Sequence, residues 1–385
     1  MTTSMSSLPG ATPPAFQPSP EALAQRSVHR AVADLRRGTP VVIRGNGTAL
    51  VVAAAETVGA QGLAELADAA AGSAVLLLAP VRAAAVLARP VPLDAPESGV
   101  VSLRLPPALL EPARLRAFAD PTAELLSPAA PLERAPVPSL ALAAQELAKL
   151  GLLLPAVVAA PALPEARPHL GSVQAADILA YPDAKASSLR RVAEARVPLE
   201  DSADTRIVAF RAADGGIEHL AMLVGEVEAV VARGDAPLAR IHSECFTGDL
   251  LGSLRCDCGP QLKGALRRMA EAGAGVLLYL AQEGRGIGLV NKLRAYTLQD
   301  DGLDTLDANR ALGYGADERR FLTAATMLEQ LGIPRVRLLT NNPDKLAALA
   351  ACGIEVAGRE AHRFAANGVN DRYLETKAER FGHML

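Results

Sequence analysis

The chain has 385 residues, which leaves room for two domains, and half of these residues are hydrophobic. The net charge of −3 gives no global field that would hold a nucleic acid, and the most apolar stretch, 148–163, is broken by Lys149, Pro155 and Pro161, so no membrane partner is expected. Four cysteines in a chain of this length do not form a disulfide framework and fit a reducing cytoplasm.

The first half is rich in Ala, Leu and Val and is punctuated by Pro. Residues 1–25 contain much Ser, Pro and Thr, so we expect a disordered tail there and no secretory signal. Asn46-Gly47 is a strong signal for a hairpin turn. Alternating elements predict an α/β domain over residues 26–182, followed by a linker at 182–188. The expected elements are helices at 28–37 and 63–71 and strands at 40–44, 49–54 and 73–78.

The second domain is expected over residues 189–385. Gly273 ends one helix, and 276–280 is a continuous apolar run that predicts a buried strand. Residues 302–309 and 362–370 are interpreted as polar loops, and 336–339 as the last buried strand. Residues 192–199 begin this domain, and the expected strands that follow lie at 207–211, 219–227 and 238–242. The expected helices lie at 260–272, at 289–299, in a segment that ends at 331, after 342 and at 373–385.

Three cysteines gather in one short stretch with the spacing C-x10-C-x-C: Cys245, Cys256 and Cys258. Thiolates suit Zn²⁺, which takes four ligands, and three protein ligands leave one position for a water that becomes a nucleophile near neutral pH. Two alternatives stay open. The cysteines are small buried hydrophobes, or His242 is the fourth ligand of a closed structural site. The many polar residues around the cysteines favour a catalytic site.

A glycine-rich turn, residues 282–288, stands between the buried strand 276–280 and the next helix. Such a turn points backbone N–H groups and a helix dipole at an anion, and Arg285, Lys292 and Arg294 favour a phosphate ligand. The alternatives are that the glycines serve only the turn and that Lys292 and Arg294 lie on a solvated helix face.

The segments HSECFTGDLLGSLRCDCGPQL, QEGRGIGLVNKLRAYTLQDDGLDTLDAN, YGADERRF, LLTNNPDKL and RYLETKAERFGHML stand in this order in the chain. Together they closely resemble the GTP cyclohydrolase II family, from about Leu189 to Leu385. The resemblance implies an α/β (α+β) fold with a mixed sheet, flanking helices and a zinc site. It also implies hydrolysis of GTP to 2,5-diamino-6-hydroxy-4-(5-phosphoribosylamino)pyrimidine, formate and pyrophosphate, the first step of riboflavin biosynthesis.

The resemblance also assigns roles to residues. It implies one Zn²⁺ per subunit on Cys245, Cys256 and Cys258, Mg²⁺ on the triphosphate, and a homodimer. It places Tyr296 in the ring-opening step and Asp317 as a base beside Arg319, which is either a nucleophile on the α-phosphate or a stabiliser of charge. The implied GTP contacts are Arg240, Ile241, His242, Ser243, Glu244, Gln261, Glu283, Gly284, Arg285, Thr305, Thr340 and Lys345. Glu283 or another acid would read the guanine edge.

The opening AVADLRRGTPVVIRGNGTALVVAAAE weakly resembles 3,4-dihydroxy-2-butanone 4-phosphate synthase. That family holds Mg²⁺ with acids in the first hairpin, where this chain has Arg44-Gly45-Asn46-Gly47. Because Mg²⁺ needs hard carboxylate oxygens, we expect a degenerate domain without that activity. The alternatives to a GTP cyclohydrolase II are a paralogue acting on another nucleotide, a non-catalytic nucleotide sensor, and a bifunctional riboflavin enzyme.

Overall fold

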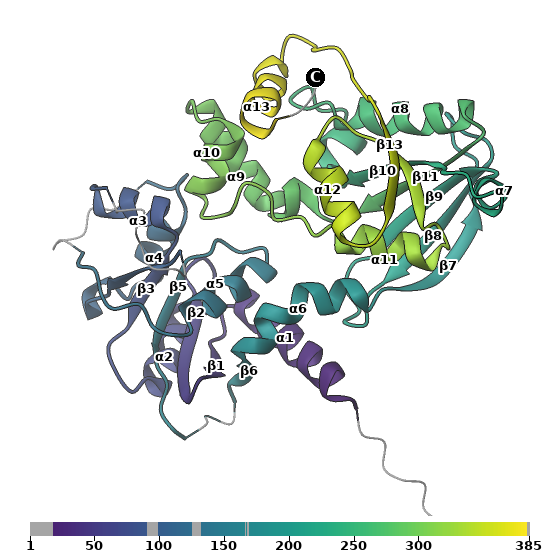
Figure 1. The fold of residues 1–385 in the computed structure, drawn as a ribbon. Coiled ribbons are helices and arrows are strands. Elements are labelled where there is room, and N and C mark those ends of the chain that lie inside the picture. Colours follow the sequence, from purple (N-terminus) through teal and green to yellow (C-terminus); the bar gives the residue numbers. More distant parts are fainter. Residues whose placement is uncertain (1–17, 91–98, 125–131, 166, 168, 383–385) are drawn as a thin grey trace, which may run out of the picture.

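The computed structural model describes residues 18–90, 99–124, 132–165, 167 and 169–382. Two β-sheets organise these residues, one built from each half of the chain, and helices cover both faces of each sheet (Figure 1). The expected α/β class with two sheets is confirmed. None of the helices in these residues combines the length and the apolar composition that crossing a bilayer requires.

The first sheet has six strands in the order β4-β3-β5-β2-β1-β6, and only the β1–β6 pair is parallel. Its strands are β1 (Val41–Gly45), β2 (Thr48–Ala54), β3 (Val75–Leu78), β4 (Val101–Arg104), β5 (Val157–Pro161) and β6 (Gly171–Gln174). Its helices are α1 (Pro20–Arg36), α2 (Ala60–Ala69), α3 (Pro80–Leu87), η1 (Pro107–Leu109), α4 (Pro112–Ala119), α5 (Ala141–Leu150) and α6 (Ala175–Ser187).

Side chains alternate between two apolar cores along the strands of this sheet, as the two-residue period of a strand requires. Leu76 and Leu78 of β3 belong to the core shared with α2, α3 and α4, whereas Leu77 faces the core shared with α1 and α5. The hairpin between β1 and β2 turns at Asn46 and Gly47, which both have positive φ values, 51° and 69°. The predicted hairpin is therefore confirmed.

The second sheet has seven strands in the order β13-β12-β10-β11-β9-β8-β7. Its strands are β7 (Arg190–Arg196), β8 (Thr205–Arg211), β9 (His219–Gly225), β10 (Leu238–Ser243), β11 (Ala274–Leu280), β12 (Arg335–Leu339) and β13 (Glu355–Glu360). Its helical elements are α7 (Val227–Ala232), η2 (Phe246–Leu250), α8 (Cys258–Glu271), η3 (Glu283–Gly286), α9 (Leu289–Asp300), α10 (Thr305–Ala311), α11 (Leu322–Gln330), α12 (Pro343–Ala351) and α13 (Asp371–Phe381).

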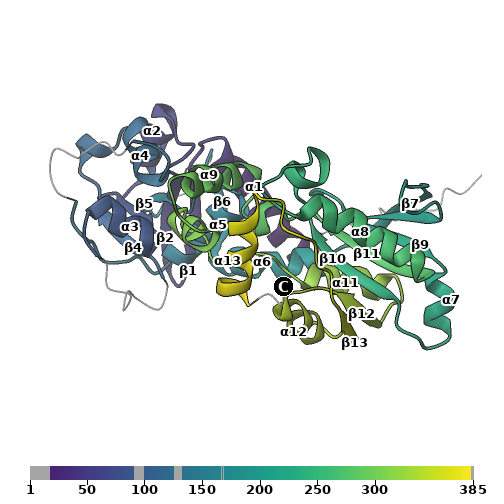
Figure 2. The same cartoon turned by 90° about the horizontal axis from the view of Figure 1, so that it is seen from above.

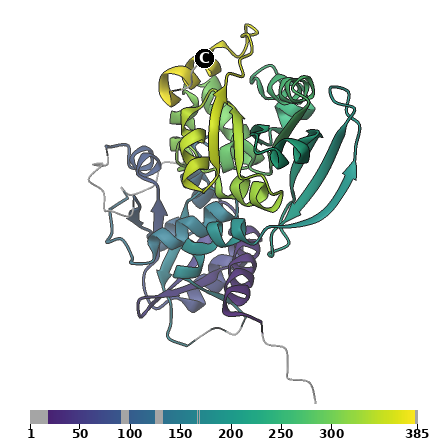
Figure 3. The same ribbon diagram turned by 45° about the vertical axis from the view of Figure 1, so that its right-hand side comes forward.

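This sheet is mixed, as predicted. Strands β11, β10, β12 and β13 run parallel, whereas β9, β8 and β7 form antiparallel pairs at the other side, where Figure 3 shows the β7–β8 hairpin at the edge. Helix α8 packs on one face, and α11 and α12 pack on the other. The carboxyl ends of β10, β11 and β12 therefore meet at one edge, where open α/β sheets bind their ligands.

Helices α9 and α10 leave the second sheet and cover part of the first one (Figure 2). Ala295 and Leu298 of α9 and Ala308 of α10 are buried in the same apolar core as Leu115 and Phe118 of α4. The two halves of the chain are thus joined by a common hydrophobic core.

Several sequence expectations are corrected by the structure. The linker expected at 182–188 is wrong, because α6 continues through Pro182 to Ser187. Packing outweighs the hydrogen bond that Pro182 cannot donate, since Ile178 is fully buried and Tyr181 donates to Asp214 across the junction at 2.5 Å. The division into domains at 26–182 and 189–385 stays a prediction.

Two further elements differ from expectation. The loop expected at 302–309 contains α10, because Asp304 caps that helix by accepting from the backbone N–H of Asp307 at 2.8 Å and Leu306 is buried. The tail expected over 1–25 ends earlier, since α1 begins at Pro20 with Ser19 as its cap; residues 1–17 lie outside the described part. Strand β12 is the last buried strand, as expected, and the more exposed strand β13 follows it.

Candidate active site

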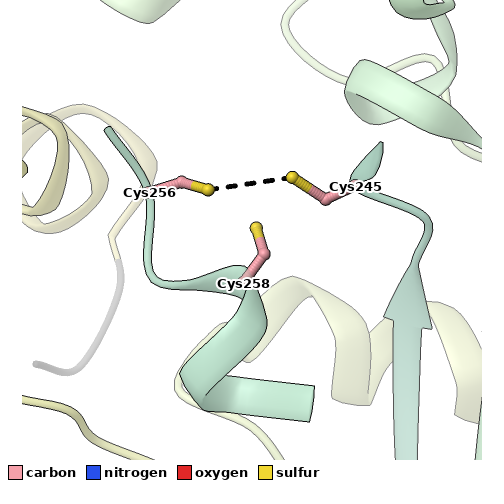
Figure 4. A group of neighbouring side chains, drawn as sticks. All are labelled: Cys245, Cys256 and Cys258. Atoms are coloured by element: carbon pink, nitrogen blue, oxygen red, sulfur yellow. Dashed lines mark hydrogen bonds between the residues drawn. The ribbon is translucent and has the colours of Figure 1, made fainter. Parts of the chain in front are cut away.

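The three cysteines come from three adjoining pieces of chain and point toward one another (Figure 4). Cys245 follows β10, Cys256 lies in a loop, and Cys258 begins α8. Their sulfur atoms all lie within 4.8 Å of one another, and Cys245 Sγ is 3.7 Å from Cys256 Sγ. All three are free thiols. This arrangement can hold one metal ion on three thiolates.

Gly248 lies directly behind the three thiols. A Cβ at this position would be 2.7 Å from Cys256 Sγ and 2.9 Å from Cys245 Sγ, closer than real contacts allow. The backbone N–H of Gly248 also donates to Cys245 Sγ at 3.3 Å. Only glycine therefore fits here, and its N–H supports the negative charge of a thiolate.

Lys292 of α9 reaches the same thiols. Its ammonium group is 3.0 Å from Cys245 Sγ, 2.9 Å from Thr247 Oγ1 and 2.9 Å from Glu283 Oε1. Hydrogen bonds with Cys256 and Cys258, and then Lys292, hold the pKa of Cys245 below its usual range. The solvated-face interpretation of Lys292 is wrong, because its side chain is buried, whereas its contact with a phosphate stays a prediction.

His242 is buried beside the cysteines but is turned to another partner. Its Nε2 lies 3.1 Å from both carboxylate oxygens of Asp249, and its ring stacks on Tyr279 at 5.6 Å. Asp249 also accepts from the backbone N–H of Cys245 and from the Tyr279 hydroxyl, each at 3.0 Å. Burial lowers the pKa of His242 although Asp249 opposes this shift. His242 thus orients the loop that carries Cys245, and among the described residues the metal-ligand group consists of the three cysteines.

One cavity opens over these thiols, at the carboxyl ends of β10, β11 and β12. It brings together every sequence-predicted site residue except Asp317, which is not part of the lining but bonds Arg319. The predicted residues that line it are Arg240, Ile241, His242, Ser243, Glu244, Cys245, Cys256, Cys258, Gln261, Glu283, Gly284, Arg285, Tyr296, Thr305, Arg319, Thr340 and Lys345.

A buried guanidinium forms part of the cavity wall. Arg240 is only 6% exposed, donates to the carbonyl of Leu339 at 3.0 Å and contacts Gln261. Burial lowers its pKa to about 10, which leaves it charged at neutral pH. Arg240 Nε and Ser243 Oγ are buried without a hydrogen-bond partner among the described residues. Such groups are costly unless something binds them, so both are suited to a polar ligand.

Arg319 and Asp317 form a bidentate ion pair. Arg319 donates to Asp317 from its backbone N–H at 3.0 Å, from Nε at 2.8 Å and from a terminal nitrogen. Burial would raise the pKa of Asp317, but the Arg319 guanidinium outweighs it and lowers that pKa. These contacts fix the orientation of the Arg319 guanidinium, which lines the cavity.

The glycine-rich turn has an unusual backbone. Gly284 and Arg285 are both left-handed, with φ values of 63° and 62°. Glu283 turns inward, where Oε2 accepts from the backbone N–H of Phe246 at 2.6 Å and Oε1 accepts from Gly284 and Lys292. Both oxygens of Glu283 are therefore engaged by the protein. Glu244 lines the same cavity, and burial, with Glu283 second, raises its pKa.

Tyr296 stands near the thiols with its ring beneath two cations. The Arg255 guanidinium lies 5.1 Å and the Lys292 ammonium 5.8 Å from the ring centre. Burial raises the pKa of Tyr296, so its phenol is protonated at neutral pH. Lys345 is buried and donates to the carbonyl of Ile241 at 2.9 Å, and Thr340 Oγ1 accepts from the backbone N–H of Asn342 at 3.0 Å.

Sequence reasoning missed other residues that line the cavity: Arg255, Ile287, Ala295, Gln299, Asn309, Asn341, Asn342 and Tyr373. Lys292 was expected beside the glycine-rich turn but not beside the thiols, although it lies four residues before Tyr296 and hence on the same helix face. No local pattern marks Tyr373, because α13 reaches the cavity only through the fold.

A second hollow lies at the β1–β2 hairpin. Its described lining runs from Arg44 to Ala49 and from Pro161 to Pro164, with Gln174, and contains no carboxylate. A site of this composition lacks the oxygen ligands that Mg²⁺ needs. That the first half lacks the synthase activity stays a prediction.

Fold and site together define an α/β protein with a cavity over three thiols that could hold a metal ion, at the carboxyl ends of parallel strands. The GTP cyclohydrolase II family model matches residues 190–361. A curated GTP cyclohydrolase-2 from Azospirillum brasilense is 49% identical over 97% of this chain and 98% of its own length, and one from Xylella fastidiosa is 39% identical over 92% and 86%. The chain belongs to the GTP cyclohydrolase II family.

Some relatives match only the second half. A GTP cyclohydrolase-2 from Pasteurella multocida is 51% identical over 52% of this chain and 89% of its own length. Among solved structures, a two-domain 3,4-dihydroxy-2-butanone 4-phosphate synthase from A. baumannii covers 88% of this chain and 99% of that chain at 18% identity, with a TM-score of 0.33. A score this low does not establish a shared fold.

Proposed function

We propose that the chain converts GTP to 2,5-diamino-6-hydroxy-4-(5-phosphoribosylamino)pyrimidine, formate and pyrophosphate, the first step of riboflavin biosynthesis. One observation carries this proposal. A three-thiol metal site and the Arg319 guanidinium line the same cavity, so one bound nucleotide can meet both. The reaction breaks bonds at the base and at the triphosphate, and it therefore needs two such centres.

Zn²⁺ fits the donor set, because Cys245, Cys256 and Cys258 offer three soft ligands in a cradle that Gly248 leaves open. An ion held by these thiolates would supply a hydroxide near neutral pH for attack on the imidazole ring. Lys292 balances the negative charge of the thiolates, and Glu283 holds Lys292 in place. The protonated phenol of Tyr296 donates a hydrogen bond in the ring-opening step.

The phosphate side is served by cations. Arg240, Arg285 and Lys345 are proposed to bind the triphosphate, and Arg319 stabilises the charge that develops at the α-phosphate. Asp317 engages both Nε and a terminal nitrogen of Arg319 and so fixes its orientation, which favours the charge-stabilising role over the nucleophilic one. Mg²⁺ is proposed to be coordinated mainly by the phosphate oxygens. The described cavity lining has no acidic cluster beside the arginine and lysine side chains that would bind the triphosphate.

The guanine edge needs an acceptor pair for its N1–H and amino group. Both oxygens of Glu283 already accept hydrogen bonds from Phe246, Gly284 and Lys292. Glu244 is therefore the better reader of guanine, with Glu283 acting through Lys292. Ser243, Gln261, Thr305 and Thr340 are proposed as further polar contacts of the nucleotide.

A homodimer is proposed as the assembly, and the cytoplasm as its location, the latter from the free cysteines. Large apolar side chains are exposed on two neighbouring segments, Leu250, Leu251 and Leu254 near η2 and Val290 and Leu293 on α9. Exposed apolar surface of this kind marks interfaces. Leu251→Lys is expected to shift the molar mass measured by light scattering to that of one chain, whereas Ile217→Lys, at an exposed apolar residue elsewhere, leaves it unchanged. A single chain before mutation contradicts the dimer.

The deciding experiment measures formate and pyrophosphate from GTP and Mg²⁺, with and without a zinc chelator, beside Cys256→Ser. We expect both products, and both lost on chelation or substitution. Pyrophosphate without formate would mean a working phosphate side and an idle zinc side. Neither product from folded, zinc-loaded protein would overturn the proposal in favour of a paralogue or a sensor.

A further inference from the structure

The turn at the end of α5, defined here as residues 149–154, belongs to the first half of the chain but touches the elements that build the cavity. Leu152 has a left-handed φ of 55°, which redirects the chain after the helix. A Cβ on Gly288, at the start of α9, would lie 3.1 Å from the Leu152 side chain. The turn thus packs against the end of the glycine-rich segment with no room to spare.

Asn291 links this turn to the cavity side. It is fully buried, and its Nδ2 donates to the carbonyls of Leu152 at 2.9 Å and Ile287 at 3.0 Å and contacts the Tyr314 hydroxyl at 3.1 Å. Its Oδ1 accepts from Arg294 at 2.7 Å. The side chain is therefore fixed on all sides, and it immediately precedes Lys292, which holds Cys245.

Arg294 extends the network into the first half. It pairs with Glu56 at 2.9 Å and with Asp120 at 2.8 Å, and Glu56 in turn accepts from the backbone N–H of Leu154 at 2.7 Å. Arg294 was expected to face phosphate or solvent. It is instead a largely buried clamp, with a side chain 18% exposed, between α9 and the first sheet.

Tyr314 makes the second connection. Its hydroxyl donates to the carbonyl of Leu153 at 2.6 Å. Four residues later, Glu318 pairs with Lys149 at 3.1 Å and donates its backbone N–H to the carbonyl of Arg285 at 3.0 Å. Glu318 stands between Asp317 and Arg319, so the turn also supports the segment that carries the phosphate-side pair.

We propose that the first half of the chain is a structural support of the active site, and that Asn291 and Tyr314 are positioning residues. The carbonyl of Leu152 fixes Asn291, and the carbonyl of Leu153 fixes Tyr314. Asn291 in turn positions the cavity-lining Lys292, and Tyr314 positions the cavity-lining Arg319. This inference rests on the proposed function for its kinetic consequence. The first half of the chain would then have a structural role that requires no catalytic activity in that half.

The test is Tyr314→Phe in the full-length chain. Loss of the hydroxyl frees the Leu153 carbonyl and loosens residues 314–319. We expect kcat for pyrophosphate release to fall about tenfold with KM within about twofold, because small misplacements of catalytic groups are costly. Amide exchange at residues 284–292 and 314–319 should quicken. Asn291→Leu should act on the same segments, and the double variant should be less than additive because the two side chains touch.

Tyr181→Phe is the matched control. Tyr181 is also buried, and its hydroxyl also bonds across the junction, to Asp214 at 2.5 Å, but on α6 and away from the cavity. We expect unchanged kcat and unchanged exchange in both cavity segments.

Equal losses in the two Tyr variants would overturn the proposal, since the effect would then be general stability. So would wild-type kcat and exchange in Tyr314→Phe. If the unaltered, zinc-loaded chain releases no product, the proposed function fails, and the exchange measurement still decides whether the turn supports the cavity.

Discussion

The ammonium of Lys292 lies 3.0 Å from the sulfur of Cys245. This contact joins α9 to the thiol cluster, and Glu283 completes it from the other side at 2.9 Å. A positive charge here offsets part of the negative charge that three thiolates would bring to a zinc ion. Lys292 therefore supports the thiol cluster that could hold a metal ion.

We therefore predict that Lys292→Met lowers zinc affinity by roughly 10- to 100-fold, the usual effect of losing a partner of a metal ligand. Competition with a coloured chelator measures the affinity directly. Lys263→Met is the control, because Lys263 is exposed on α8, the helix that begins at Cys258. Equal zinc affinity in the two variants would contradict the assigned role.

Gly248→Ala should empty the metal site. The new methyl group would lie 2.7 Å from Cys256 Sγ, so the thiols must separate or the loop must shift. Metal analysis of purified protein should find zinc near zero in this variant. Gly358→Ala, in β13, meets nothing within 4 Å and should retain the wild-type zinc content. A zinc-loaded Gly248→Ala protein would show that the cradle is not needed.

His219 should make the fold acid-sensitive. Burial, followed by the charge of Lys185, lowers its pKa to about 4, and its neutral Nδ1 accepts from the backbone N–H of Ala281 at 3.0 Å. Between about pH 6.5 and 4 the unfolded chain binds the proton that the folded chain excludes. Stability from this group is complete above pH 6.5 and is lost as the pH falls, by up to about 3 kcal/mol.

Urea unfolding at several pH values tests this prediction. In His219→Asn, whose side-chain oxygen can accept the same hydrogen bond, the fall in unfolding free energy between pH 6.5 and 4 should be smaller. His29→Asn, at an exposed residue of α1, should keep the wild-type slope. A wild-type slope in His219→Asn would show that His219 does not control the acid response.

Arg319→Lys keeps the positive charge but loses the bidentate guanidinium contact with Asp317. Pyrophosphate release should slow by roughly 100-fold, because an oriented charge near the reacting phosphate is worth that much. Zinc content should not change. Arg320→Lys is a control from the neighbouring position, where the side chain is 52% exposed and its closest acid, Asp183, is 4.0 Å away. Equal rates in Arg319→Lys and the wild type would remove Arg319 from the phosphate side.

Local signals predicted much of the fold and the cavity. Asn46-Gly47 predicted a hairpin because both positions need a positive φ, and both have one. The cysteine spacing predicted the thiol cluster, since Cys245 and Cys256 are joined by a short loop and Cys258 follows at once. In each case the residues that determine the structure are close together in the sequence.

The failures have the opposite cause. Pro182 indicated a linker, but Tyr181 and Ile178 hold α6 together through distant partners. Lys292 and Arg294 suggested a phosphate site or a solvated face, yet their partners lie 47 and 174 residues away, at Cys245 and Asp120. No pattern within one helix reports such partners, because the tertiary fold alone brings them together.

The shared core has a consequence for anyone who shortens this protein. A chain cut before Arg190 would keep α9 and α10 but lose the α4 side chains and first-sheet strands that cover Ala295, Leu298 and Ala308. The shortened chain would expose a new apolar surface beside the proposed catalytic groups, and such a surface favours self-association. The sequence boundary before Arg190 is therefore a poor place to truncate this chain.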